Sequence, residues 1–321
     1  MLKRYTDNIE AYQLYLRGNY HLYKFTPDDL QQALRYFNEA IAKDPDYALA
    51  YAGLAAAYGI ATDFGNEAGA VQVEIKAREA IALDPTLAEA RAMLAAFSFW
   101  NKRDTAKAQD EFMRALELNP NSVIAHHYYS WFLIATSRPD EAQEHLRRAL
   151  EIDPLSPSIN VDQGLPFYFS RRYAEARARY EQALKLDENF SYAHLRLAEA
   201  CEGMGDTACA ISAFERAIGH VNNNTLRAQL ARALALAGKR EEARRLLKEL
   251  TASDATPHAS LYYVALAYAA LGERDKAFDS LDRALAKQDK WLGWMKVDPR
   301  LDFVRSDPRF QDLLRRMGFA Q

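Results

Sequence analysis

The histidines are the residues of this chain best suited to bind a metal, and their spacing argues against a metal site. His126 and His127 are adjacent. On a helix, adjacent side chains point about 100° apart, so the pair cannot share an ion as histidines four residues apart do. The others are spread along the chain without a carboxylate or cysteine at ligand spacing: His21, His145, His194, His220 and His258. We expect neither a metal nor another cofactor.

The chain also lacks the patterns that build nucleophiles and phosphate sites in enzymes. It contains no GxSxG, no GxxxxGKS/T and no GxGxxG. Its cysteines, Cys201 and Cys209, lack the CxxC spacing of a redox motif. We expect reduced thiols in the core, with a redox pair as the alternative. The residue pattern therefore favours a protein that is not an enzyme.

Small and aromatic residues at helical spacing indicate which elements position these side chains. Ala33, Phe37 and Ala40 fall on one face of a helix and let a second helix approach closely. Asp44-Pro45-Asp46 ends that helix, because proline cannot extend it and disfavours helical geometry in the preceding residue. An alanine-rich apolar helix then begins at Tyr47. The unit is a helix, a proline turn and a second helix.

The same pattern recurs along nearly the whole chain. Its second small or apolar position falls at Ala40, Ala80, Ala115, Ala149, Ala183, Ala217, Leu250 and Ala284. The steps between these positions are 40, 35, 34, 34, 34, 33 and 34 residues. Such a period, with its small, aromatic and proline positions, resembles the tetratricopeptide repeat (TPR). The resemblance implies an all-α fold, a right-handed superhelical solenoid of about eight TPR helix pairs plus a C-terminal capping helix.

The period also predicts the domain organisation. We expect a TPR array over 1–290, with repeats at about 5–45, 47–85, 88–120, 123–154, 157–188, 191–222, 224–255 and 258–289. Pro166 within the fifth repeat predicts a late start or a kink in its first helix. Residues 291–321 are expected to cap the array, because Phe310, Leu313, Leu314 and Met317 follow helical spacing and Gly318 ends that helix. A cap covers the apolar face of the last repeat.

The TPR resemblance implies a concave groove lined by fixed positions of the first helices. Carried onto this register, the candidate ligand- or peptide-binding residues are Phe99, Trp100, His127, Trp131, Tyr168, Phe169, Tyr192, Glu199, Arg232 and Tyr262. Tryptophan and tyrosine offer large contact areas and dominate binding hot spots. A shift of one residue in the register would place Trp131 or Tyr168 in the core, so core packing is the alternative. Only Arg232 suits the clamp for a terminal carboxylate used by chaperone-binding relatives, and we do not expect that mode.

Charge and hydropathy exclude some classes of partner. The formal net charge is −3 and the isoelectric point near 6.2, so the chain has no overall attraction for nucleic acid or an anionic membrane. Neither a run of 18 apolar residues nor the apolar core of a secretory signal is present. We expect a cytoplasmic protein whose partner is a protein or peptide, with the oligomeric state left open.

A second resemblance concerns the two ends of the chain. The tail VDPRLDFVRSDPRFQDLLRRMGF, together with the opening TDNIEAYQLYLRG, resembles the C-terminal TPR region of bacterial multidomain signalling proteins. There, such arrays follow a serine/threonine kinase, a class III nucleotide cyclase or a winged-helix regulator. The resemblance implies a non-catalytic docking module, and the uncapped opening Met1-Leu2-Lys3-Arg4 favours a piece of a longer chain. The alternative is an array that encloses a small molecule or short peptide and switches a fused effector domain.

Overall fold

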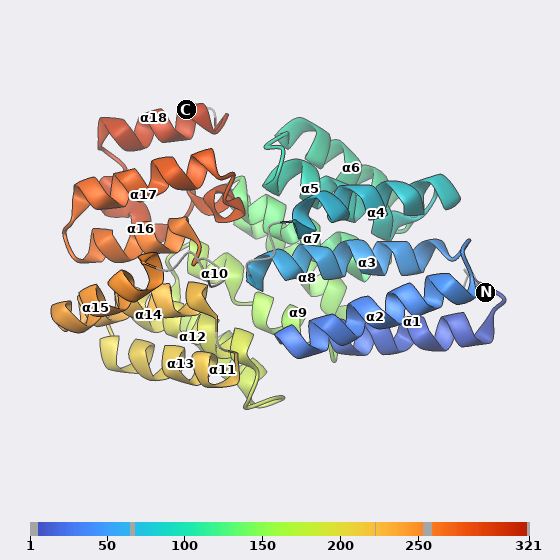
Figure 1. The fold of residues 1–321 in the computed structure, drawn as a ribbon, viewed down its shortest axis with the longest axis horizontal. Helices are drawn as coiled ribbons and strands as arrows, with labels where there is room; N and C mark the ends of the chain where they lie inside the picture. The colour runs from blue at the N-terminus through green and yellow to red at the C-terminus, as the bar shows by residue number, and fades with distance from the viewer. Residues whose placement is uncertain (1–5, 65–67, 222, 253–258, 320–321) are drawn as a thin grey trace. The chain divides into compact units, whose positions relative to one another are not determined.

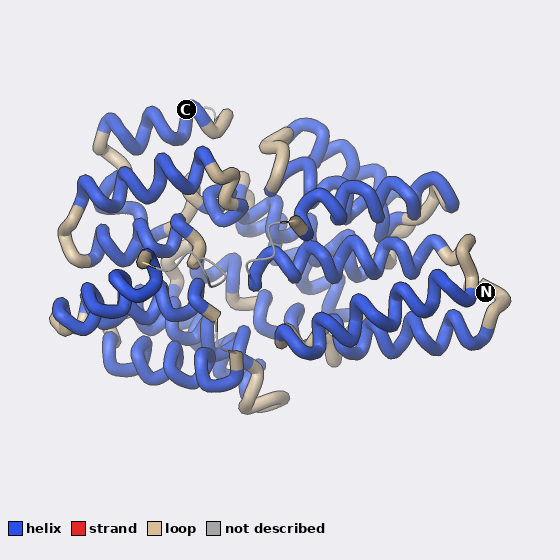
Figure 2. Tube along the Cα trace, viewed as in Figure 1, coloured by secondary structure: helices blue, strands red, loops and turns tan. Residues whose placement is uncertain are grey.

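All regular structure in the described part of the chain is helical. The computed structural model describes residues 6–64, 68–221, 223–252 and 259–319, and within these ranges no strand is present (Figure 2). The helices follow one another in consecutive pairs along the chain (Figure 1). The predicted all-α array of helix pairs is therefore confirmed.

The first four pairs have regular lengths. They are α1 (Ile9–Leu22) with α2 (Pro27–Lys43), α3 (Ala48–Ala61) with α4 (Gly69–Leu83), α5 (Ala88–Trp100) with α6 (Thr105–Leu118), and α7 (Val123–Ala135) with α8 (Pro139–Ile152). A short 3-10 turn, η1 (Thr62–Phe64), follows α3.

The later pairs include one broken helix. The fifth pair has α9 (Pro157–Asp162) and α10 (Leu165–Phe169) in place of a continuous first helix, followed by α11 (Tyr173–Leu184). Then come α12 (Ser191–Gly203) with α13 (Thr207–His220), α14 (Asn224–Leu236) with α15 (Arg240–Thr251), and α16 (Leu261–Ala270) with α17 (Arg274–Ala286). Pro166 lies in the first turn of α10, where its missing N–H costs no hydrogen bond. The interruption predicted from this proline is confirmed.

After α17 the chain forms a tail of different character. It consists of the 3-10 helices η2 (Lys290–Trp294) and η3 (Pro299–Val304) and the short α18 (Pro308–Arg316). Asp289, Asp298 and Asp307 each precede one of these elements and accept a hydrogen bond from a backbone N–H in its first turn. Each short helix therefore begins at an aspartate cap.

Close helix packing, both within the first repeat and between it and the second, depends on glycine facing an aromatic ring. Ala33, Phe37 and Ala40 are fully buried. A Cβ atom added to Gly18 or Gly53 would lie 2.5 or 2.6 Å from the Phe37 ring, which is closer than van der Waals contact permits. α1 and α3 can thus approach the ring of α2 only because these two positions lack a side chain.

The turns between repeats share two hydrogen-bonding devices. The aspartate or asparagine that ends a second helix accepts a hydrogen bond from the backbone N–H two residues on, as in Asp44 with Asp46, Asp84 with Thr86, Asn119 with Asn121 and Asp187 with Asn189. A side chain of the following helix contacts the carbonyl six residues before it, as in Tyr51, Arg91, His126 and His194. These Asx turns fix the geometry at which consecutive repeats join.

The chain divides into two compact units. The first contains residues up to 132 together with 144–159, and the second contains 133–143 and 160 onward. In the first unit, a core around Phe37, Leu54 and Met93 joins the opening repeats. In the second, tail residues Leu292 and Met295 share a core with residues of α14, α16 and α17.

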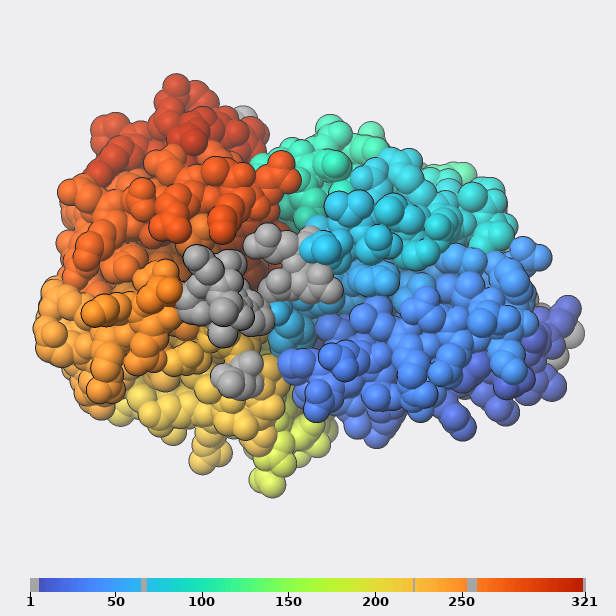
Figure 3. All heavy atoms as spheres, viewed as in Figure 1, coloured from blue at the N-terminus to red at the C-terminus, as the bar shows by residue number. Residues whose placement is uncertain are grey.

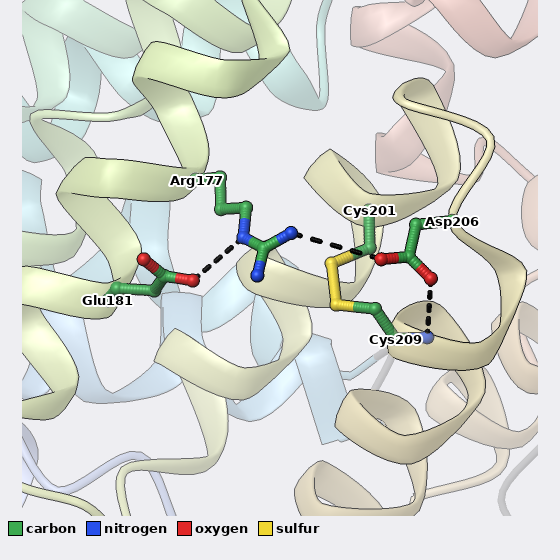
Figure 4. The surroundings of a disulfide bond; sticks show 5 residues. All are labelled: Arg177, Glu181, Cys201, Asp206 and Cys209. Carbon is green, nitrogen blue, oxygen red and sulfur yellow. Dashed lines mark hydrogen bonds and ion pairs between the residues drawn. A yellow bond between two sulfur atoms is a disulfide. The ribbon is translucent and has the colours of Figure 1, made fainter.

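The expectation of reduced thiols is wrong. Cys201 near the end of α12 and Cys209 in the first turn of α13 form a disulfide (Figure 4). The side chain of Asp206 caps α13 by accepting the Cys209 N–H at 3.0 Å, and Arg177 lies 3.9 Å from the other Asp206 oxygen (Figure 4). The two cysteines lie on either side of the turn between α12 and α13, which folds the helices back against each other and brings the thiols together. A disulfide of this kind does not need the CxxC spacing.

Candidate ligand-binding surfaces

A small apolar pocket opens on the first unit. It is lined by residues of α1, α3, α7 and α9 and by the residues that follow α1. Each of these four helices comes first in its helix pair. Its lining includes Tyr23, Ile60, Ile124, His127, Tyr128 and Trp131. Its volume is about 20 Å³, enough for roughly one water molecule. The pocket is therefore a shallow hollow that can receive the end of one side chain but not a whole ligand.

Three aromatic side chains of α7 form one wall of the pocket. The Trp131 ring lies 5.0 Å from the His127 ring and 5.1 Å from the Tyr128 ring, measured between centroids. They meet because residues three and four apart share one face of a helix. His127 is buried, whereas Tyr128 and Trp131 are half-buried and still present ring surface to solvent. This wall combines a fixed geometry with accessible aromatic area.

The Tyr23 phenol, which lines the pocket, carries no charge at neutral pH. Burial raises the pKa of the Tyr23 phenol well above its usual value, and the neighbouring phenols of Tyr15 and Tyr128 raise it further. The phenol therefore stays protonated and uncharged at neutral pH. The surroundings favour an apolar group rather than a charged one.

In the second unit, the chain's own tail lies across the first helices. The Arg300 guanidinium donates to Glu199 of α12 at 2.9 Å and to Gln229 of α14 at 3.3 Å. The Tyr262 hydroxyl of α16 donates to Asp298 at 2.6 Å. Three successive first helices thus bind an Asp298-Pro299-Arg300 segment of the tail.

Further contacts hold the tail on either side of the Asp298-Pro299-Arg300 segment. The Phe169 and Trp294 rings stack with centroids 4.8 Å apart and planes 14° from parallel. Arg171 donates two hydrogen bonds to the carboxylate of Asp302, at 2.8 and 2.6 Å. Aromatic stacking and a bidentate ion pair therefore flank the buried Asp298-Pro299-Arg300 segment.

The charges beneath the tail are deeply buried. Asp298 is fully buried and Arg300 is 8% exposed. Burial alone would raise the pKa of Asp298, but the charge and hydrogen bonds of Arg300 hold it below its usual value. Burial raises the pKa of Glu202, although Arg232 donates to one of its oxygens at 3.2 Å. The other Glu202 oxygen has no hydrogen-bond partner in the part of the chain that is described.

The ten predicted site residues divide by exposure. Six are buried: Phe99, His127, Tyr168, Phe169, Glu199 and Tyr262. Four are half-buried: Trp100, Trp131, Tyr192 and Arg232. Of these ten, His127 and Trp131 line the pocket of the first unit. Phe169, Glu199 and Tyr262 are among the residues that the tail contacts.

The remaining predicted residues make contacts within the array. Phe99 packs edge-on against Phe132 and Trp100, with centroids 5.0 and 4.7 Å away. The Tyr192 hydroxyl donates to Asp162 at 2.7 Å. Tyr128 lay outside the predicted set, although its position three residues before Trp131 could have identified it. The tail residues Asp298 and Arg300 carried no periodic signal that would have linked them to the groove.

The residues that the structure describes contain no group of three or more histidine, cysteine, aspartate or glutamate side chains able to hold a metal ion. None of their helices has both the length and the apolar character needed to cross a membrane.

Comparison with known families identifies the repeats. Four family profiles described as tetratricopeptide repeat match residues 88–122, 111–144, 161–224 and 259–289. The chain therefore contains tetratricopeptide repeats in both of its units.

Similar proteins include bacterial ones. The transcriptional regulator HilA of Salmonella paratyphi A is 24% identical over 253 residues, which cover 78% of this chain and 40% of HilA. The chain thus spans well under half the length of this relative. The type IV pilus assembly protein PilF of Pseudomonas aeruginosa is 28% identical over 131 residues, covering 40% of this chain and 51% of PilF.

Among solved structures, yeast Tom70 aligns with 98% of this chain and 69% of its own, at a TM-score of 0.54 and 17% identity. A human IFIT1 dimer solved with PPP-AAAA aligns with 80% of this chain and 68% of its own, at a TM-score of 0.55 and 18% identity. At these identities the likeness concerns the fold.

Proposed function

We propose that the chain is a non-catalytic interaction module that binds a peptide or protein segment through the pocket of the first unit. The observation that carries this proposal is the wall of His127, Tyr128 and Trp131, which places accessible aromatic surface in a preformed hollow on first helices. Large aromatic side chains in such positions supply most of the energy of many interfaces.

The second unit is a poorer candidate for the partner site. Glu199, Gln229 and Tyr262 are the residues through which its first helices would contact a ligand, and each already bonds to the tail. A partner there would have to displace buried ion pairs, which leaves charges without compensation. The available site is therefore the pocket around Trp131.

The chemistry of the pocket restricts the partner. Its walls are apolar and aromatic, and its one strongly perturbed phenol is neutral. An aromatic or branched aliphatic side chain, presented by a helix or an extended segment, fits this environment. A single anchor of this kind, surrounded by weaker contacts, gives a docking interaction rather than an enclosed complex.

The test uses a library of random linear peptides selected on the wild-type chain. The best binder is expected to carry an aromatic or aliphatic anchor and to lose about 30-fold in affinity for Trp131→Ala, the effect of losing a hot spot of about 2 kcal/mol. Phe303→Ala is the matched control, because Phe303 is an exposed aromatic residue outside the pocket. Helicity measured by circular dichroism should stay unchanged in both variants.

Equal affinity of the selected peptides for the wild-type chain and Trp131→Ala would contradict the proposal. So would selection of peptides whose binding depends on Phe303. Either result would move the interaction surface away from the aromatic wall of α7.

The signalling context is part of the same proposal. The similarity to the transcriptional regulator HilA, of which the match covers 40%, supports an array that docks partners for a longer bacterial regulatory protein. The composition, with a net charge of −3, favours protein partners over nucleic acid. The coding sequence that flanks this chain tests the context directly, since an adjoining effector domain is expected there.

A second candidate is a sensor that encloses a small molecule or a short peptide and switches a fused effector domain. The apolar lining of the pocket agrees with a small-ligand site, but the pocket is too shallow for a whole ligand, so this candidate is the weaker of the two. A thermal-shift screen of metabolites separates the two candidates, because a tight small ligand raises the melting temperature of the array. If no metabolite raises the melting temperature, the result favours peptide docking over ligand sensing.

A further inference from the structure

The outer face of α1 carries a stripe of four large apolar side chains exposed to solvent. Ile9 is 68% exposed, Tyr12 49%, Leu16 47% and Tyr20 63%. They recur at intervals of three and four residues and so form one continuous face of the helix. The dark-blue atoms of this first helix reach the surface at the edge of the first unit (Figure 3).

This stripe lies opposite the face that packs into the repeat. Ala11, Gly18 and Leu22 are buried against the unit's own core, and at about 100° per residue they lie on the other side of the helix axis from Leu16. Soluble proteins rarely expose a contiguous stripe of large apolar side chains, so this face of α1 indicates a contact surface.

The charges beside the stripe are arranged to match a second copy of the same helix. Glu10 lies near the beginning of α1 and Arg17 lies seven residues later, on the same flank of the stripe. When two copies pair antiparallel about a two-fold axis, the same flank of each helix faces its counterpart. Glu10 of each copy then lies opposite Arg17 of the other, and Ile9 lies opposite Tyr20.

The present partners of these charges are weak enough to be exchanged. Glu10 pairs with Lys43 at 2.9 Å, but the two side chains are 62% and 47% exposed. Arg17 has its guanidinium 6.0 Å from the Tyr36 ring, at the limit of a cation–π contact. Exposed contacts of this kind contribute little, so pairing with a second copy costs little.

We propose that α1 is a homodimerisation surface at which two copies of the chain pair antiparallel. Ile9, Tyr12, Leu16 and Tyr20 form the apolar centre of the contact, and two symmetric Glu10–Arg17 pairs flank it. A helix of 14 residues is about 21 Å long. It buries less area than a standard interface of about 1,600 Å², so we expect a reversible dimer in the micromolar range.

The first test measures mass by sedimentation velocity from about 1 to about 200 µM, a range that spans micromolar dissociation constants. The wild-type chain is expected to shift from monomer to dimer. Leu16→Lys is expected to remain monomeric at every concentration, because each dimer would bury two uncompensated charges. Leu155→Lys is the matched control, since Leu155 is 81% exposed in the same unit and lies outside α1. It should dimerise as the wild-type chain does.

The second test reverses the flanking charges. Glu10→Arg and Arg17→Glu should each weaken the dimer by about tenfold, because each substitution creates two like-charge contacts by symmetry. The double variant Glu10→Arg/Arg17→Glu should restore the wild-type dissociation constant. A wild-type chain that stays monomeric overturns the proposal and assigns the stripe to a different occupant. A dimer that survives Leu16→Lys, or a double variant without restoration, overturns it as well.

Discussion

Trp131 and Arg300 both lie on the surfaces formed by the first helices of the repeats, but their surroundings differ. Trp131 is half-buried between His127 and Tyr128 and still offers ring surface to solvent. Arg300 is surrounded by Glu199, Asp298 and the Tyr263 ring. One residue can receive a partner, whereas the other is itself the bound group.

The repeat register predicts Glu199 and Tyr262 as groove residues for a ligand, and that role stays a prediction. In the structure both residues are buried and bond to a segment of the tail. That segment belongs to the same chain, since Arg300 lies 101 residues beyond Glu199. A contact at such a separation leaves no periodic trace, so neither the register nor the composition of the tail could predict it.

The disulfide illustrates the same limit at shorter range. Cys209 lies eight positions after Cys201, and this spacing alone is compatible with two unrelated core thiols. The position of the turn between α12 and α13 decides the outcome, because it folds the second helix back against the first. The absence of a CxxC motif therefore does not exclude a disulfide across a helical hairpin.

His126 predicts a pH dependence of stability. Burial lowers its pKa below the ordinary value of 6.5, although the Pro120 carbonyl at 3.0 Å partly opposes this shift. The unfolded chain therefore binds a proton more readily than the folded one. The contribution of His126 is fully present above pH 6.5 and is lost as the pH falls from there through its folded-state value.

The measurement is the free energy of unfolding in urea at several pH values between about 7.5 and 5, a range in which histidine titrates. The wild-type chain should lose stability on acidification, and His126→Asn should show a smaller pH slope at the cost of lower stability at pH 7.5. Comparing slopes removes the opposing contribution of Glu202, whose pKa is raised by burial. An identical slope in both proteins would refute the assignment.

At the scale of elements, the repeat pattern predicts helices well because local chemistry and packing agree. Small residues permit close approach, aromatic rings such as Phe37 fill the seam, and Asx turns end several of the repeats. Pro166 correctly predicted the division of the fifth repeat's first helix. The tail, with its short 3-10 helices, lacks a period, and only α18 could be expected from its apolar spacing.

The tail contact predicts two unequal effects of removing an arginine. Arg300→Met leaves Glu199 and Asp298 buried with fewer compensating charges, so we expect a loss of about 3–5 kcal/mol from the stability of the second unit. Arg171→Met is the matched control, because Arg171 also pairs with a tail carboxylate but the pair is about half exposed. Its loss should stay below about 1 kcal/mol.

Urea unfolding followed by a probe in the second unit measures both losses. Solenoid proteins can unfold in parts, so the transition of this unit is the relevant one. Losses of equal size in the two variants would show that the Arg300 contacts contribute no more than an exposed ion pair. The account of a closed surface on the second unit would then fail.

At the scale of the molecule, two compact units built from the same repeat present different surfaces. The first has an aromatic pocket on its first helices, and the second has the equivalent helices covered by the tail. Repeat arrays allow this difference, because each repeat depends mainly on its neighbours. The central claim is that partner binding belongs to the first unit.

Hydrogen–deuterium exchange of the chain, with and without the peptide selected on it, tests that claim most directly. We expect slower exchange in α7 and around the end of α1, where the pocket residues lie, and unchanged exchange in α12, α14 and α16. Protection confined to those three helices, together with faster exchange of 290–304, would mean that the peptide displaces the tail. That result would contradict the account.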